Sequence, residues 1–142
     1  MPETTPTTID RITADAMATI VRDAGYKAIV GKNDEGITVI ESANGGWTTT
    51  IRMLGQKGDE FSSLQFILWL GDKDRSVSLA KMNDFNANWR FAKGWVNTLQ
   101  PGVCLQWDVD LEGGVAPTYL AKRIAAWDLL VQAFRAYMVE QK

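Results

Sequence analysis

Three carboxylates alternate along one stretch of the chain and are the first residues that could do chemistry. Asp108, Asp110 and Glu112 are each two positions apart, in and directly after "VCLQWDVD". In an extended strand this spacing puts the three side chains on one face, about 7 Å apart. Such carboxylates can bind a metal ion or act as general acid and base, but a calcium loop or a glycosidase cleft needs further features. We therefore interpret them as solvent-facing charge and expect no metal and no cofactor.

A second candidate is the asparagine-rich stretch "MNDFNANWRFAKGW", residues 82–95. Met82, Phe85 and Trp89 have helical spacing, and Asn86 falls beside that apolar stripe. Its amide can tie the helix to a neighbouring loop or strand end, or it can bind a ligand. We expect the tie, at least partly buried. A small-ligand site or an enzyme using Asp108, Asp110, Arg90 and nearby asparagines is the alternative, which convergence of these side chains in one concave pocket would support.

Histidine and cysteine usage excludes several kinds of site. The chain has no histidine, so Ser-His-Asp triads, Cys-His pairs and histidine-containing zinc sites are impossible within it. Its single cysteine, Cys104, cannot form an intrachain disulfide, which favours a reducing compartment. Because Cys104 lies in an apolar run, a small buried hydrophobe is the expected role, with a reactive thiol as the alternative.

Length and charge limit the architecture and the partners. The 142 residues fit one domain, for which we predict residues 9–142, preceded by a disordered tail at residues 1–8 that is rich in threonine and proline. A net charge of −2 with scattered basic residues argues against nucleic acid, and Lys122-Arg123 reads as a solvated helix face. No signal peptide or long apolar run is present, so we expect a cytoplasmic protein without a membrane partner.

Hydrophobic periodicity predicts an α+β fold: an antiparallel sheet of about five to six strands, a helix at each end of the chain and a short helix between. The first helix is expected to run from Ile9 to Ala24, stopped by Gly25. Pro117 suits the first position of the last helix, and its expected apolar stripe comprises Leu120, Ile124, Trp127, Val131, Phe134 and Met138. The predicted strands cover residues 26–31, 36–42, 47–54, 62–71, 94–99 and 103–111, with a turn at 100–102.

The strand "SSLQFILWLG" has bulky apolar groups on both faces. Leu64, Phe66 and Leu68 share one face, whereas Ile67 and Trp69 lie beside Gln65 on the other. Something is expected to cover that second face, either the short helix of this chain or another subunit. A symmetric dimer would hide both copies of the patch with one contact, so Ile67 and Trp69 are the candidate interaction surface.

Five segments in order resemble the YbjN family of bacterial sensory transduction regulators: "AGY", "SSLQF", "MNDFNANWRF", "QWDVDLEGGV" and "AAWDLLVQAF". The likeness covers roughly residues 9 to 139. It matches Asn83, Asn86, Arg90 and Phe91 to the family's asparagine-rich helix, Asp108, Asp110, Gly113, Gly114 and Val115 to its acidic strand and glycine turn, and Trp127 and Phe134 to its last helix.

The resemblance implies a fold like that of type III secretion chaperones, which are small dimeric proteins that bind other proteins. The expected function is thus a non-enzymatic regulatory or chaperone-like protein-binding domain that forms a homodimer and whose further partner the sequence does not name.

Overall fold

The structure, a computed structural model, describes residues 8–71, 79–97 and 102–140, with side chains as far as Met138. Of the tail expected at residues 1–8, only Thr8 falls in this range. The expected turn at 100–102 lies outside it except for Gly102.

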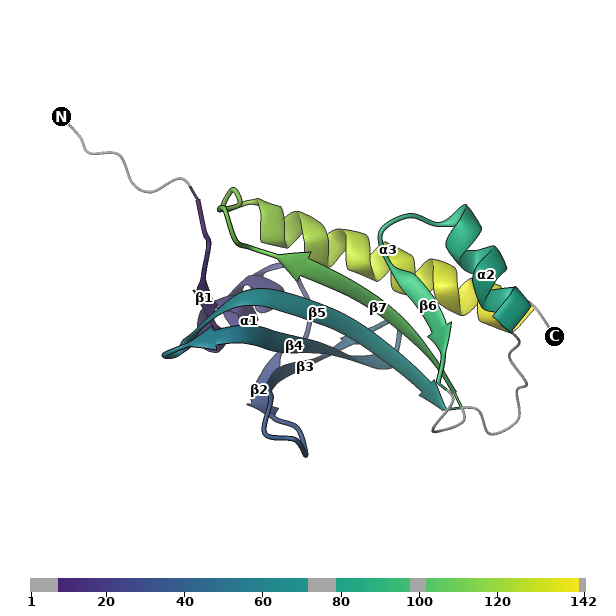
Figure 1. Cartoon of the computed structure of the whole chain (residues 1–142), viewed down its shortest axis with the longest axis horizontal. Coiled ribbons are helices and arrows are strands. Elements are labelled where there is room, and N and C mark those ends of the chain that lie inside the picture. The colour runs from purple at the N-terminus through teal and green to yellow at the C-terminus, as the bar shows by residue number, and fades with distance from the viewer. Residues whose placement is uncertain (1–7, 72–78, 98–101, 141–142) are drawn as a thin grey trace.

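An antiparallel sheet of seven strands forms the centre of the molecule, in the order β2-β3-β4-β5-β7-β6, with β1 pairing to β5 beyond that path (Figure 1). The α+β class expected from the sequence is confirmed. The strands are β1 (Ile12–Thr13), β2 (Ile29–Lys32), β3 (Thr38–Asn44), β4 (Trp47–Lys57), β5 (Glu60–Gly71), β6 (Lys93–Val96) and β7 (Gly102–Asp110).

The first helix is shorter than its apolar spacing predicted. Helix α1 (Ala14–Asp23) begins after Thr13, whose hydroxyl accepts a hydrogen bond from the backbone N–H of Ala16 at 3.1 Å. The preceding residues are extended, because Ile12 pairs with Phe61 of β5 and Ile9 bridges to Val115. The prediction that this helix starts at Ile9 is therefore wrong: pairing with distant strands overrides the local period.

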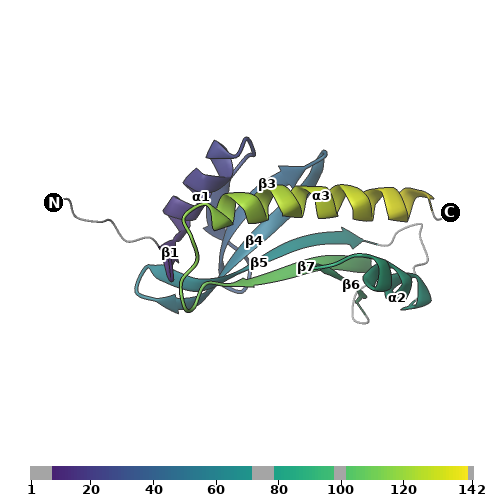
Figure 2. The same ribbon diagram turned by 90° about the horizontal axis from the view of Figure 1, so that it is seen from above.

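Helix α3 (Tyr119–Glu140) crosses one face of the sheet and closes the core (Figures 1 and 2). Its predicted apolar stripe is confirmed, since all six side chains are buried. The helix starts at Tyr119, two positions later than the expected start at Pro117. Phe66 of β5 packs between two tryptophans, with ring centroids 5.4 Å from Trp127 and 6.1 Å from Trp107. Both tryptophans belong to the core.

The turn between β3 and β4 is fixed to α3 at two places, Asp128 and Arg135. Asn44 is buried; its Nδ2 donates to Asp128 Oδ1 at 2.9 Å, and its Oδ1 accepts from the Thr49 hydroxyl at 2.6 Å. Further along α3, Arg135 donates to the carbonyl of Gly45 at 2.6 Å. These contacts give the buried Asn44 amide its hydrogen-bond partners, and they hold the β3–β4 turn against α3.

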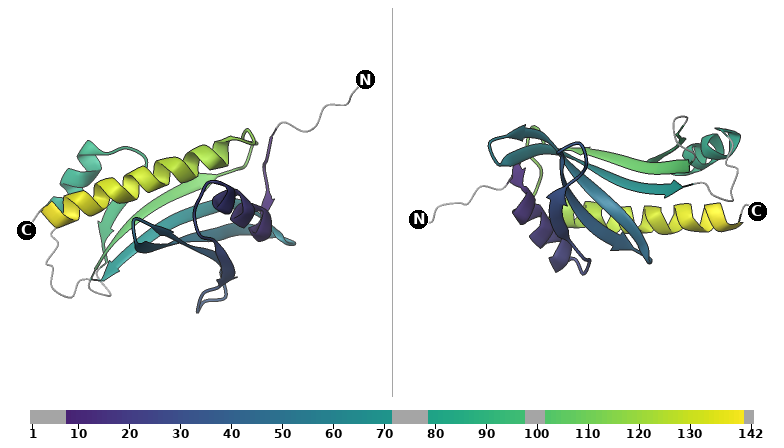
Figure 3. Two further views of the ribbon diagram at one scale, coloured as in Figure 1. Left: turned by 180° about the vertical axis from the view of Figure 1, so that it is seen from behind. Right: turned by 90° about the horizontal axis from the view of Figure 1, so that it is seen from below.

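Helix α2 (Leu79–Asn88) lies beside the edge strand β6 and the C-terminal half of α3 (Figures 1 and 3). Phe85 meets Phe134 of α3 edge-on, with centroids 5.0 Å apart. Met82 and Phe85 are buried as predicted, whereas Trp89, expected in the same stripe, is exposed. Because the helix is short and sits at the sheet edge, only its middle turn reaches the core.

Asn86 joins α2 to β6 through both ends of its amide. Its Nδ2 donates to the carbonyl of Gly94 at 3.0 Å, and its Oδ1 accepts from the Gly94 N–H at 2.8 Å. Gly94 is buried so tightly that an added Cβ would lie 2.9 Å from Met82 Sδ. The contact is the tie expected from the sequence, although Asn86 itself is exposed rather than partly buried.

Replacing Asn86 with alanine should lower the free energy of unfolding by about 1–3 kcal/mol, because the buried N–H and C=O of Gly94 lose their partner. Denaturant titration measures this difference. Asn83→Ala is the matched control, since Asn83 is an exposed asparagine of the same helix. Equal stability of the two variants would contradict the structural role of Asn86.

Candidate functional site

The face of the sheet opposite α3, here called the open face, carries the candidate site. Along β5, Leu64, Phe66 and Leu68 point to the core, so the alternating residues Gln65, Ile67 and Trp69 point to the open face. Within the described ranges, no helix or strand lies over them, and Figure 2 shows α1 and α3 on the other side. The sequence left open whether the short helix covers Ile67 and Trp69; α2 packs at β6 and α3 instead.

Two tryptophans and one cysteine form an aromatic patch at one end of this face. Cys104 of β7 pairs with Trp69 of β5 on one side and with Trp95 of β6 on the other. The rings are 39% and 37% exposed, while Cys104 is 2% exposed. The Trp69 ring lies against Gly102, where an added Cβ would come within 2.8 Å of it. Glycine at 102 therefore allows the ring to approach β7 closely.

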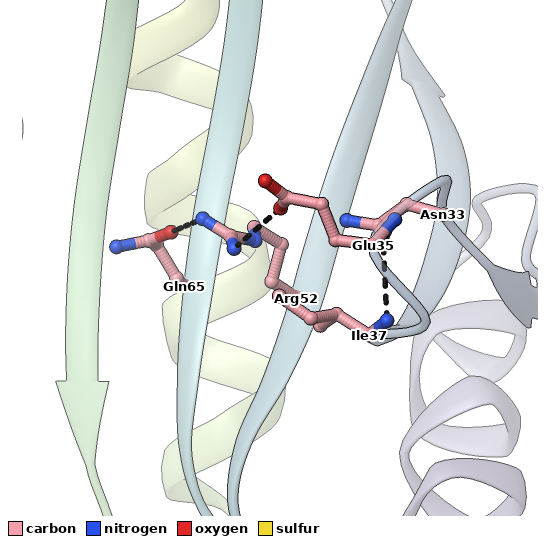
Figure 4. A network of polar contacts seen from close by, with 5 residues as sticks. All are labelled: Asn33, Glu35, Ile37, Arg52 and Gln65. Carbon is pink, nitrogen blue, oxygen red and sulfur yellow. Dashed lines mark hydrogen bonds and ion pairs between the residues drawn. The ribbon is translucent and has the colours of Figure 1, made fainter.

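A row of polar side chains crosses the open face beside this patch, here called the polar belt. Arg52 Nη1 donates to Gln65 Oε1 at 2.9 Å, and Gln65 Nε2 donates to Asp108 Oδ1 at 2.8 Å. The row continues through Gln106, whose Nε2 lies 3.3 Å from Asp108 and whose Oε1 accepts from the Trp95 indole at 3.1 Å. Figure 4 shows its start at Arg52.

The belt was not predicted from the sequence. The alternation of polar and apolar residues in the sequence does place four residues on polar strand faces: Arg52, Gln65, Gln106 and Asp108. Their contacts need the register in which Arg52 pairs with Gln65 and Gln65 with Asp108. Asp108 is exposed as expected, but two glutamine amides hold its carboxylate in place.

A cavity of about 810 Å³ opens next to the belt, between the β2–β3 hairpin and the central strands. We call it the Arg52 cavity. Arg52 lies in it with Ile67 and Trp69, and Glu35 from the hairpin turn reaches over to Arg52 Nη2 at 3.8 Å (Figure 4). The candidate interaction residues from the sequence thus belong both to the aromatic patch and to a concave site.

Burial raises the pKa of the Cys104 thiol from 9.0 to about 12, although the positive charges of Lys93 and Arg52 oppose the shift. Desolvation outweighs both cations because the thiolate would lie under the aromatic patch, away from water. A thiol with this pKa is protonated at neutral pH and is a poor nucleophile. The prediction of a buried, hydrophobe-like cysteine agrees with this environment.

Arg90 does not join the carboxylates. Its guanidinium lies 4.7 Å from the centroid of the Phe91 ring, and Phe91 packs 5.6 Å from Trp107 on the helix-covered side. Asp108, the next residue after Trp107, points to the opposite face. Asp110 accepts a hydrogen bond from the backbone N–H of Glu112 at 3.0 Å. The sheet therefore separates the residues on which the enzyme alternative depended.

The aromatic contacts near Arg90 extend to α3 through Arg123. Arg123 lies over Trp107 at 5.5 Å and over Tyr119 at 4.8 Å, so it is not the freely solvated residue that the basic pair suggested. Phe91 has a φ of 79°, a strained value for a side chain with a Cβ, and it is exposed. Its ring packs against that of Trp107, which gives this strain a packing reason.

The remaining residues that carry the family resemblance lie in a turn, in the core and on α2. Gly113 and Gly114 have φ values of 92° and 91°, which the tight turn after β7 requires. The turn is closed by the Gly114 N–H, which donates to the Leu111 carbonyl at 2.9 Å. Trp127 lies in the core, and Asn83 is exposed on α2.

Neither a metal site nor a membrane span is found in the described part of the chain. Cysteine, aspartate and glutamate side chains do not gather there in threes as metal ligands would. The helices of the described ranges are also too short or too polar to cross a lipid bilayer.

Comparison with known proteins gives one match. The family model YbjN, described as "Putative bacterial sensory transduction regulator", matches residues 13–140. No curated protein and no solved structure matches the chain.

The raised pKa of Cys104 predicts slow alkylation. A pKa of about 12 instead of 9.0 leaves roughly a thousandfold less thiolate near pH 8, so iodoacetamide should label the native protein at least that much more slowly than the urea-unfolded chain. Between pH 9 and about pH 11 the native rate should still rise about tenfold per pH unit, whereas the unfolded rate levels off. Mass spectrometry measures both rates, with Cys104→Ser as the control. Equal native and unfolded rates would contradict the buried thiol.

Proposed function

Since the chain belongs to the YbjN family, we propose that it is a non-enzymatic regulatory domain that acts by binding protein through its open face. The family description supports a regulatory role, and the open face supplies a surface that can serve it. The cytoplasm is the compartment proposed for it, because Cys104 is a free thiol.

One observation carries this proposal: the open face combines exposed rings with polar groups that already have partners. Trp69 and Trp95 are exposed on it, and aromatic side chains supply much of the binding energy at protein contacts. Next to them, Gln65 and Gln106 are bonded within the belt. Burying such groups against a partner leaves few unmet hydrogen bonds, so the desolvation cost stays low.

The enzyme alternative has less support. Catalytic groups must converge on a reacting atom, whereas Arg90 lies on the side of the sheet opposite Asp108. Asn86, the other member of that set, uses its amide to hold Gly94. A non-enzymatic role therefore remains our proposal.

The occupant that the open face fits is a second copy of this chain. Arg52 on β4 and Asp108 on β7 lie at the same level, each paired with Gln65 of the strand between them. A two-fold axis along β5 would place Arg52 of one copy opposite Asp108 of the other, twice. The same axis brings the two copies of Ile67 and Trp69 together at the centre. Charge and apolar surface are thus both self-complementary.

Sedimentation tests this dimer. The unmodified protein should have about twice the 15.8 kDa chain mass at micromolar concentration, and Trp69→Glu should shift it to the monomer, because the axis would bury two carboxylates face to face. Trp89→Glu is the matched control: Trp89 is as exposed as Trp69 but follows α2, away from the open face. A dimer unaffected by Trp69→Glu would contradict the contact.

A mixing experiment separates contacts between chains from contacts within one chain. Arg52→Glu and Asp108→Arg should each weaken the homodimer, because like charges then oppose each other at both contacts. An equal mixture of the two variants restores opposite charges across the axis and should form a heterodimer. Within each variant chain, the hydrogen bonds of the polar belt remain broken. Recovery of the dimer in the mixture can therefore come only from contacts between the two chains. Monomers in the mixture, or in the unmodified protein, would remove the second copy as the occupant.

A further inference from the structure

The Arg52 cavity has the size of a small-molecule site. Its volume of about 810 Å³ falls within the range of pockets that hold small ligands. The β2–β3 hairpin forms one wall and β4 and β5 form the floor, so the lining comes from segments far apart in the sequence (Figure 4). It unites a charged group with an apolar wall, and these two features determine which ligand it would bind.

Arg52 has more donor capacity than the protein uses. Nη1 donates to Gln65 at 2.9 Å, but Nε is buried and, within the described residues, has no hydrogen-bond partner. The third nitrogen, Nη2, is 3.8 Å from the carboxylate of Glu35, beyond hydrogen-bond length. Because Nε is buried, the donors left for an anion are the second N–H of Nη1 and those of Nη2, and a carboxylate can accept from both nitrogens at once.

Glu35 can give way to such an anion without any change in the backbone. Its side chain is 75% exposed, and an exposed ion pair at this distance holds weakly. The turn that carries it is fixed independently, because Asn33 Oδ1 accepts from the N–H groups of Glu35 and Ile37, both at 2.9 Å. Rotation of the Glu35 side chain toward solvent would therefore open Arg52 and leave the hairpin in place.

The rest of the lining selects the chemical class. Ile29 and Val39 on the hairpin and Ile67 and Trp69 on the floor give apolar lining, suited to a hydrocarbon or aryl group. Among the described residues, the charged members of the lining are Lys32, Arg52, Glu35 and Glu41, two of each sign. When Glu35 turns to solvent, a ligand with one negative charge restores this balance.

We propose that the Arg52 cavity binds a monocarboxylic acid with an apolar tail. The carboxylate takes the place of Glu35 on Arg52, and the tail lies along Ile67 and Trp69. This site goes beyond the proposed function and is accessible in a chain whose open face is not covered by a second copy.

Octanoate is the test ligand, followed through backbone amide and indole signals in ¹H–¹⁵N NMR spectra at a protein concentration at which sedimentation finds the monomer. Saturable shifts should appear at Arg52, Gln65 and the Trp69 indole, with a stoichiometry of one. Octanol, with the same tail and no charge, should bind about tenfold more weakly, since an ion pair with good geometry accounts for a difference of that order. Shifts spread over the molecule without saturation would overturn the site.

Three variants identify the carboxylate partner. Arg52→Gln should weaken octanoate about tenfold and leave octanol unchanged, while Glu35→Gln should strengthen octanoate, because the internal competitor is gone. Lys57→Gln is the control, since it removes a positive charge from the same strand outside the cavity lining. Circular dichroism shows whether the Arg52→Gln variant is folded. The Glu35→Gln variant tests the replacement of Glu35 by the ligand's carboxylate without any change at Arg52. Octanoate affinity equal in all four proteins would overturn the proposal.

Discussion

The packing of one long helix on one face of the sheet is the constraint on which the rest of the structure depends. Six apolar side chains of α3 are buried, and Phe134 and Trp127 are each in contact with rings of other elements. Burying a large apolar side chain of this kind contributes about 1.5–3 kcal/mol, so this stripe is a large part of the hydrophobic stabilisation. Because a single helix of this length covers a single face, the opposite face is left to the strands themselves.

The open face holds both polar and apolar side chains, and the way they alternate keeps the two kinds in separate areas. The polar belt runs from β4 through β5 to β7, and it divides the aromatic patch from the acidic end at Asp110. The sheet edges are short as well, since β2 and β6 have four residues each, which limits strand addition. The apolar area is thereby confined to the surroundings of Trp69, where it can be recognised by shape and charge.

The sequence predicted those features that depend on local period. The stripe of α3 and the faces of β5 follow from spacing along one element, and both are confirmed. The start of α1 was wrong because Ile12 pairs with Phe61, a contact that spacing cannot reveal. Arg123 was misjudged for a similar reason: its aromatic partners lie on β7 and one turn earlier in α3.

The candidate site was predictable only in part, for the same physical reason. Ile67 and Trp69 stood out because they broke the alternation of their own strand. Arg52 gave no such signal, since an arginine on a polar strand face is ordinary. Its importance comes from register, which aligns it with Asp108, and from the β2–β3 hairpin, which encloses it. A site assembled from three strands is set by their pairing, and pairing is decided by the whole sheet.

The two proposals share side chains, and this sharing has a thermodynamic consequence. The acid in the Arg52 cavity and the second copy on the open face both require Ile67, Trp69 and the guanidinium of Arg52, so they exclude each other on one chain. Linkage makes the exclusion reciprocal: the factor by which the acid weakens dimerisation equals the factor by which dimerisation weakens the acid. Glu35 sets the balance, because it occupies Arg52 when neither is bound. A small acid would in this way control an association between proteins, which is the behaviour that a sensory regulator requires.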